Sequence, residues 1–158
     1  MSDVRNKPAT LMPPPLVYLS GLALAVWLDR RFPLGFPVPP GLKWLAWGLL
    51  AVSLLLMGWA ALTVWRARTT VNPYRGARAL VTQGPFSFSR NPIYLADALA
   101  YLALTLLLAS FWPLLIAPLV WLIMRYGVIA HEEAHLRARF GADYERYCAQ
   151  VSRWFGRR

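Results

Sequence analysis

The sequence predicts an all-α, polytopic membrane protein with about four transmembrane helices, from its composition, its long uncharged runs and the placement of its basic residues. Of the 158 residues, 58% are hydrophobic and only 15% are charged, against about 25% charged in typical globular chains. The net charge is +10, but the basic residues flank apolar runs, which favours a lipid bilayer over nucleic acid as partner. The length suits a single integral membrane domain over residues 1–158.

The first two predicted spans are residues 11–28 and 44–65. The first run has 18 residues without a charge, and its prolines stand at the start, where a helix tolerates them. The "DRRF" that follows lacks the small-residue site of a cleaved signal peptide, so an uncleaved span is predicted. The second run has 22 uncharged residues with tryptophans at both ends. It is long enough to cross a hydrocarbon core of about 30 Å.

Residues 92–130 are predicted to form a tight helical hairpin that supplies the third and fourth spans. Two apolar runs, 92–111 and 113–130, have 20 and 18 residues, with almost nothing between them. So short a connection makes the two helices antiparallel neighbours.

Positions in the hairpin predict which side chains lie at equal depth. In an antiparallel pair the sum of two residue numbers at one depth is nearly constant. With the turn at Phe111, Asn91 is level with His131, and Asp97 is level with Arg125. A charge within the hydrocarbon zone usually faces a partner or a cavity. Asp97 and Arg125 are therefore expected to form an ion pair, the alternatives being that Arg125 lines a substrate cavity or snorkels to the headgroups.

The distribution of basic residues predicts the orientation. The N-terminal segment, the 66–91 loop and the tail after residue 130 hold 13 of the 17 Lys and Arg residues, whereas the 29–43 loop holds three. Basic loops stay in the cytoplasm. We therefore expect a multi-pass protein of the cell (inner) membrane, with both termini, the 66–91 loop and the 131–158 helical segment on the cytoplasmic side.

The same hairpin makes "SRNPIY" and "HEEAH" neighbours at the cytoplasmic boundary. Asn91 is a good N-cap and Pro92 a good first helical residue. The exposed N–H groups of a helix start can hold an anion such as a carboxylate. Glu132 and Glu133 would stand opposite it, so the pair of clusters suits a zwitterionic ligand. The alternative is a capped helix beside ordinary helix-end charges.

The "HEEAH" stretch also matches the H-E-x-x-H pattern of zinc proteases. On a helix, His131 and His135 would share a face, with Glu132 as general base. A catalytic zinc needs a third protein ligand, and Asp97, the remote candidate, is two turns too deep. No metal is therefore expected, and a membrane zinc metalloprotease is kept as an alternative function.

Two stretches carry a family likeness when taken together. They are "RALVTQGPFSFSRNPIYL" and, after a hydrophobic hairpin, "EEAHLRARFGADYERYCAQVSRW". The combination resembles the isoprenylcysteine carboxyl methyltransferase family, integral membrane enzymes with phospholipid methyltransferase relatives. The likeness covers residues 69–154, about half of the chain.

The resemblance implies S-adenosylmethionine as the methyl donor, held between the cytoplasmic ends of the hairpin and the C-terminal segment. Carried over position by position, it implies cofactor contacts from Arg78, Ala79, Leu80, Val81, Gly84, Phe86, Arg90, Asn91, Pro92, Ile93, Tyr94 and Glu132. Within this set, Asn91 to Tyr94 would hold the amino-acid end, and Glu132 its amino group. Gly84 would shape the turn before them.

Two departures from the family pattern bear on the methyl acceptor. The eukaryotic enzymes have His where Asn91 stands and a substrate-linked Arg where Val128 stands. Arg125, one turn deeper, is the candidate substitute and would steer an acidic acceptor. An amine acceptor would need a base, for which His131 or Glu133 would serve. The expected substrate is thus a lipophilic or membrane-embedded carboxylate, thiol or amine.

The C-terminal segment is expected to close the site. Tyr144, Tyr147, Val151 and Trp154 fall at offsets of 3, 7 and 10, which places them on one apolar helix face. That face would either rest on the membrane or anchor the tail to the protein. Besides zinc proteolysis, the alternatives are an NADPH-dependent sterol reductase, which generally needs more spans, and a non-enzymatic membrane protein.

Overall fold

The computed structural model describes residues 13–68 and 79–157. Their regular secondary structure is helical, with two isolated β-bridges and no strand among them. The helices are α2 (Pro14–Arg31), α3 (Pro40–Arg66), the 3-10 helix η1 (Gly84–Ser87), α4 (Pro92–Leu108), α5 (Trp112–Leu122), the π-helix η2 (Ile123–Ile129), α6 (Ala130–Phe140) and α7 (Ala142–Gln150). The all-α prediction is confirmed. Residues 11–12 of the first predicted span and 69–78 of the predicted loop, Arg78 among them, lie outside the described residues.

Proline sets the start of the four longest apolar segments. Pro14, Pro40, Pro92 and Pro113 stand in the first turn of α2, α3, α4 and α5. A proline there costs no hydrogen bond, because the first N–H groups of a helix have no partner within it, and its fixed φ suits the helix. The sequence therefore fixes these helix starts locally.

The turn between α4 and α5 is short, as predicted, and the loop after α2 fastens it. Ala109, with φ of 54°, reverses the chain. The Phe36 N–H donates to the carbonyl of Ala109 at 2.9 Å, and the Phe36 and Phe111 rings lie 4.8 Å apart. Asp29 accepts a hydrogen bond from the Ser110 hydroxyl at 2.8 Å. This end of the bundle is thus held together by backbone, aromatic and side-chain contacts.

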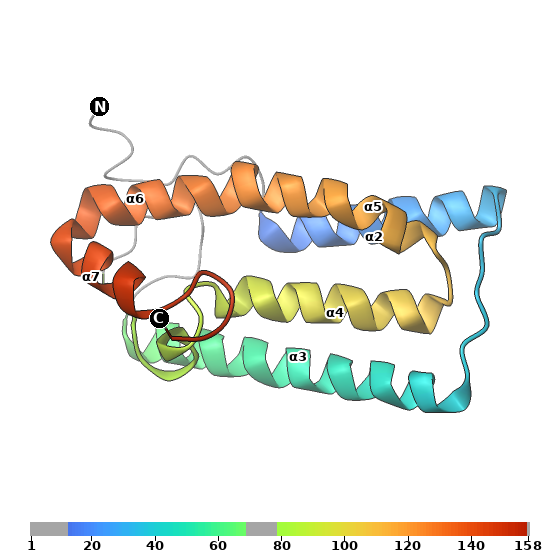
Figure 1. Ribbon diagram of the computed structural model, residues 1–158, viewed down its shortest axis with the longest axis horizontal. Helices are drawn as coiled ribbons and strands as arrows, with labels where there is room; N and C mark the ends of the chain where they lie inside the picture. Colours follow the sequence, from blue (N-terminus) through green and yellow to red (C-terminus); the bar gives the residue numbers. More distant parts are fainter. Residues whose placement is uncertain (1–12, 69–78, 158) are drawn as a thin grey trace.

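α5, η2 and α6 run on as one helix of 29 residues, Trp112–Phe140. The predicted fourth span, 113–130, is only its first part, and residues 131–140 continue the same helix (Figure 1). In its middle, η2 has the wider turn of a π-helix, which changes the direction in which later side chains point. Gly141, with φ of 52°, ends the helix and lets α7 fold back.

α4 lies between α3 and the long helix, while α2 packs on α5 and also contacts α4 (Figure 1). The main core consists of Val17, Ala25, Tyr94, Tyr101, Ile116, Val120, Met124, Val128 and Ile129. The Tyr101 hydroxyl donates to the carbonyl of Pro113 at 2.8 Å and so ties α4 to α5. At Gly21 an added Cβ would lie 2.6 Å from Cγ2 of Val120, so α2 and α5 approach closely only because this residue is glycine.

The predicted ion pair between Asp97 and Arg125 is wrong. Arg125 is in η2, and its guanidinium lies over the rings of Trp121 and Tyr126, 5.2 and 5.5 Å from their centroids. Oδ2 of Asp97 is buried, and no hydrogen bond or ion pair reaches it from the described residues. The depth calculation assumed a regular α-helix, whereas the π-helical turn changes the direction of the Arg125 side chain.

Within residues 13–68 and 79–157, two helices are long and apolar enough to cross a membrane, namely α3 and the continuous helix Trp112–Phe140. α4 is apolar but has 17 residues, and α2 ends on three charged residues. The surface of α3 suits lipid contact, because Trp44, Leu55 and Trp65 are each more than 70% exposed. Two of the four predicted spans therefore meet the criteria of length and hydropathy.

The apolar face of the C-terminal segment packs on the protein itself, so its expected contact with the membrane is wrong. Tyr144, Tyr147 and Val151 are buried and form a C-terminal cluster with Leu80, Leu136, Phe140 and Cys148. Trp154 packs against the main core instead. Gly141 allows this because it turns α7 back toward η1. The face anchors the tail, which was the other expectation.

Candidate functional site

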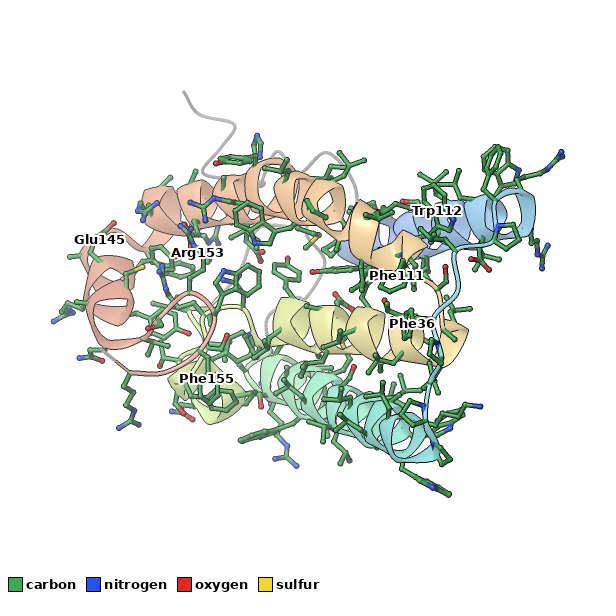
Figure 2. The ribbon with its side chains drawn as sticks, turned by 45° about the vertical axis from the view of Figure 1, so that its right-hand side comes forward. Phe36, Phe111, Trp112, Glu145, Arg153 and Phe155 are labelled. Carbon is green, nitrogen blue, oxygen red and sulfur yellow. The ribbon has the colours of Figure 1, made fainter. Side chains whose placement is uncertain are left out.

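The start of α4 and the first turn of α6 meet at the end of the bundle opposite the turn. The Tyr94 hydroxyl donates a hydrogen bond of 2.6 Å to Oε2 of Glu132. Nη1 of Arg90 lies 3.4 Å from Oε1 of Glu133. The predicted proximity of "SRNPIY" and "HEEAH" is confirmed. Figure 2 shows Arg153 and Phe155 at this end, and Phe36, Phe111 and Trp112 at the other.

Glu133 is the buried centre of an ion cluster that also contains Arg90, Arg137 and Arg153, here called the Glu133 cluster. Nε and Nη2 of Arg153 donate to the two carboxylate oxygens of Glu133, each at 2.8 Å. Arg137 approaches the same carboxylate at 4.0 Å. Hydrogen bonding to Glu133 raises the pKa of Arg153. Because Glu133 is only 5% exposed, these guanidinium groups supply the charge compensation that its burial requires.

Asn91 occupies the N-cap position of α4, but its side chain does not cap the helix. Nδ2 donates instead to the carbonyl of Arg153 at 3.0 Å. The Asn91 N–H donates to the buried hydroxyl of Ser89. The capping predicted from sequence is therefore wrong in its side-chain contact, because the C-terminal segment binds the Asn91 amide. The N–H groups of the first turn of α4 have no side-chain cap.

The short helix η1 brings Gly84 and Phe86 close to the start of α4. Gly84 has φ of 59°, and an added Cβ would lie 3.0 Å from Oγ1 of Thr63, so the turn needs glycine for conformation and for space. The Tyr147 hydroxyl donates to the carbonyl of Phe86 at 2.7 Å. Burial raises the pKa of Tyr147, which keeps the hydroxyl protonated as a donor. η1 is thus held between α3 and α7.

The remaining predicted cofactor residues lie around the same end of the bundle. Leu80 packs on the C-terminal cluster. Pro92 is buried in the first turn of α4, and Ile93 packs against the main core. Ala79 and Val81 are half-buried ahead of η1.

The three predicted catalytic residues have different surroundings. His131 precedes Glu132 on the long helix, and its Nδ1 is buried without a hydrogen-bond partner among the described residues. Both oxygens of Glu133 accept hydrogen bonds from Arg153. Arg125 contacts two aromatic rings and forms no ion pair within the described part of the chain. Of the three, His131 has a buried polar atom without a partner among the described residues.

The residues described contain no group of three or more His, Cys, Asp or Glu side chains placed to hold a metal ion. His135, the second histidine of the H-E-x-x-H match, is buried at 1% exposure. Within 13–68 and 79–157, therefore, no third ligand joins His131 and His135.

The sequence model of the phospholipid methyltransferase family matches residues 42–143, close to two thirds of the chain. The chain belongs to the phospholipid methyltransferase family. The matched range runs from α3 to the start of α7 and includes the Tyr94–Glu132 contact. Comparisons with curated proteins and with solved structures gave no match.

Membership of the phospholipid methyltransferase family makes the protein a membrane methyltransferase. The two candidate spans agree with membrane association. The match supports the wider group of membrane methyltransferases named in the sequence resemblance, and it does not single out the isoprenylcysteine carboxyl branch.

Two residues of this methyltransferase's site were not anticipated from its sequence. Arg153 completes the Glu133 cluster from 20 positions away. Cys148 lies 2.8 Å from Nη1 of Arg90 and accepts its hydrogen bond. A signal was present, since Arg153 is a basic residue beside the apolar C-terminal face. The partner of Arg153 could not be predicted from the sequence, because the reversal of the chain at Gly141 determines which carboxylate Arg153 reaches.

Proposed function

We propose that the protein is an S-adenosylmethionine-dependent integral membrane methyltransferase with a lipophilic or membrane-embedded small acceptor. The observation that carries the proposal is the contact between Tyr94 and Glu132, which joins two separate polar motifs at one end of the bundle. Both residues lie within the range matched by the methyltransferase family.

The residues at this end suit a zwitterionic cofactor. The N–H groups of the first turn of α4 lack a side-chain cap, and such groups bind carboxylates. Glu132 supplies a carboxylate for an ammonium group, and the hydrogen bond from Tyr94 fixes its position. Leu80, Gly84 and Phe86 provide an apolar approach from η1 and the segment before it.

S-adenosylmethionine, when bound, supplies a methyl group that is already activated on a sulfonium sulfur. The protein therefore contributes mainly positioning and exclusion of water. Glu132 and Tyr94 orient the cofactor, and the Glu133 cluster holds the C-terminal segment over the start of α4. For an acceptor that must lose a proton, His131 is the proposed base, and the lack of a partner for its Nδ1 among the described residues supports this role.

The proposed topology has four spans, α2, α3, α4 and the α5–η2 part of the long helix, in the cell (inner) membrane. Both termini and the 66–91 loop lie in the cytoplasm, because most basic residues flank that side. The methyl donor, a soluble cytoplasmic compound, then reaches the site directly, and the acceptor reaches it from the bilayer.

Calorimetric titration of the full chain in lipid nanodiscs with S-adenosylhomocysteine tests the function. Wild-type protein is expected to bind. Glu132→Gln and Tyr94→Phe are each expected to weaken binding at least about tenfold, because each removes one partner of a charged hydrogen bond. Glu145→Gln is the matched control, since it removes an exposed carboxylate at the same end. Folded wild-type protein without affinity, or equal affinity in all variants, would contradict the proposal.

A further inference from the structure

Asp97 is a half-buried acidic residue that the proposed cofactor site does not use. It lies on α4 about 7.5 Å from the helix start, at 1.5 Å per residue. Its Oδ2 is buried and receives no hydrogen bond from the described residues. A carboxylate in such surroundings is costly unless a partner compensates it, and acidic residues retained within a membrane span usually serve a ligand or a proton.

Among the residues that the structure describes, the groups around Asp97 are acidic or aromatic, and no ion pair joins it to a basic side chain. Asp97 interacts electrostatically with the hydroxyls of Tyr18 on α2 and Tyr94 on its own helix. Glu132 is the next acidic group, and the Tyr94 hydroxyl donates to it. Arg125, the basic residue expected here, lies over two aromatic rings instead. The electrostatic potential around Asp97 therefore attracts a positive or hydrogen-bond-donating group.

Tyr94 connects this residue with the cofactor end of the bundle. Tyr94 and Asp97 are three residues apart on one helix, so their side chains share a face. Tyr94 reaches Glu132 with its hydroxyl, while Asp97 lies one turn nearer the bilayer centre. The residue before Asp97 is bound to α3, because the Ser53 hydroxyl donates a hydrogen bond of 2.8 Å to the backbone carbonyl of Ala96. Oδ2 of Asp97 is left without a partner among the described residues, within reach of Tyr18 on α2.

We infer that Asp97 is the residue that recognises the polar end of the methyl acceptor, and that it selects a group that donates hydrogen bonds, an amine or a hydroxyl, over a carboxylate. The inference rests on the proposed function and adds the chemistry of its acceptor. An N–H or O–H group of the acceptor satisfies the bare oxygen of Asp97, whereas a carboxylate would be repelled there. The reacting atom is then held one turn below Glu132, on the membrane side of the cofactor.

Three single-chain amphiphiles with one tail and different heads test this inference: dodecylamine, dodecanol and dodecanoate. Binding of each to the full chain in detergent is measured by native mass spectrometry, for wild type, Asp97→Asn and Asp97→Leu. Wild type is expected to prefer the amine or the alcohol over the carboxylate. Both Asp97 substitutions are expected to lower the affinity for the amine or the alcohol about tenfold, the effect of removing a charged hydrogen-bond partner.

Two controls make the result decisive. Glu145→Gln removes an exposed carboxylate and is expected to keep the wild-type preference. S-adenosylhomocysteine binding is measured in each variant and is expected to be unchanged by Asp97→Asn, which also shows that the variant is folded. A wild-type preference for dodecanoate, or an unchanged preference in both Asp97 variants, overturns the inference. Absence of S-adenosylhomocysteine binding in wild type overturns the proposed function instead.

Discussion

Glu133 is the residue on which the C-terminal segment depends. Its carboxylate is almost fully buried, and the bidentate contact with Arg153 is the shortest of its ion pairs. An uncompensated buried charge is far more costly than a missing surface pair. The cluster therefore stabilises the tail over the start of α4, in addition to any effect on the cofactor.

Arg153→Gln is expected to lower the free energy of unfolding by roughly 2 kcal/mol, because it leaves Glu133 with only the longer contacts to Arg90 and Arg137. The measurement is unfolding of the detergent-solubilised protein by SDS, followed by tryptophan fluorescence. Arg146→Gln is the matched control, since its ion pair with Asp143 is exposed and worth little. Equal effects of the two substitutions would show that the cluster is not stabilising.

At the level of single residues, sequence reasoning was successful where a motif is local. The proximity of "SRNPIY" and "HEEAH" followed from two local motifs and a short turn, and the Tyr94–Glu132 hydrogen bond confirms that the two stretches meet. The Asp97–Arg125 pair failed because the π-helical turn of η2 cannot be read from an apolar run. Arg153 was missed because its partner is chosen by the fold-back at Gly141.

At the scale of the helices, the packing of α2 against α5 depends on one close contact, between Gly21 and Val120. Gly21 lies so near Val120 that a methyl group there would overlap Cγ2, and valine is too stiff to move away easily. The contact joins the N-terminal helix to the helix that carries Glu132. Helix starts were predictable because proline marks them. The contact between Gly21 and Val120 was not predictable, because it depends on how closely two helices far apart in sequence pack.

Gly21→Ala is expected to lower the free energy of unfolding by about 1–3 kcal/mol, the usual cost of overpacking. Val120→Ala in the same chain should recover part of the loss, because it removes the overlapping methyl group. Gly48→Ala serves as control, since nothing lies within 4 Å of its added Cβ. Unfolding in SDS measures all four proteins, and a harmless Gly21→Ala would contradict the close approach.

Over the whole molecule, the charge pattern and the helix order describe one topology. The start of α3 and the C-terminal segment lie at opposite ends of the bundle (Figure 1). In the proposed orientation the first faces outward and the second faces the cytoplasm. The family match covers α3 to the start of α7, so the shared architecture includes both ends.

Two cysteine substitutions test this topology in a Cys148→Ser background. Gly41→Cys is expected to react with a membrane-impermeant maleimide added to intact cells, because Gly41 is exposed at the start of α3. Glu145→Cys is expected to react only in inverted vesicles, since its side chain is exposed on α7. The opposite pattern, or labelling of both positions from one side, would refute the orientation.

The fastening of the turn at residues 109–111 has a mechanical consequence. Asp29, Phe36 and Ser110 join α2, its following loop and the hairpin at one end. Separation of α4 from the long helix at the other end requires only that the polar contacts Tyr94–Glu132 and Arg90–Glu133 break. α4 is about 25 Å long, and a small tilt about the fastened end therefore moves its free end the furthest. Under the proposed function, an acceptor that arrives from the bilayer would therefore enter by displacing the Tyr94 end of α4, while the turn at residues 109–111 stays closed.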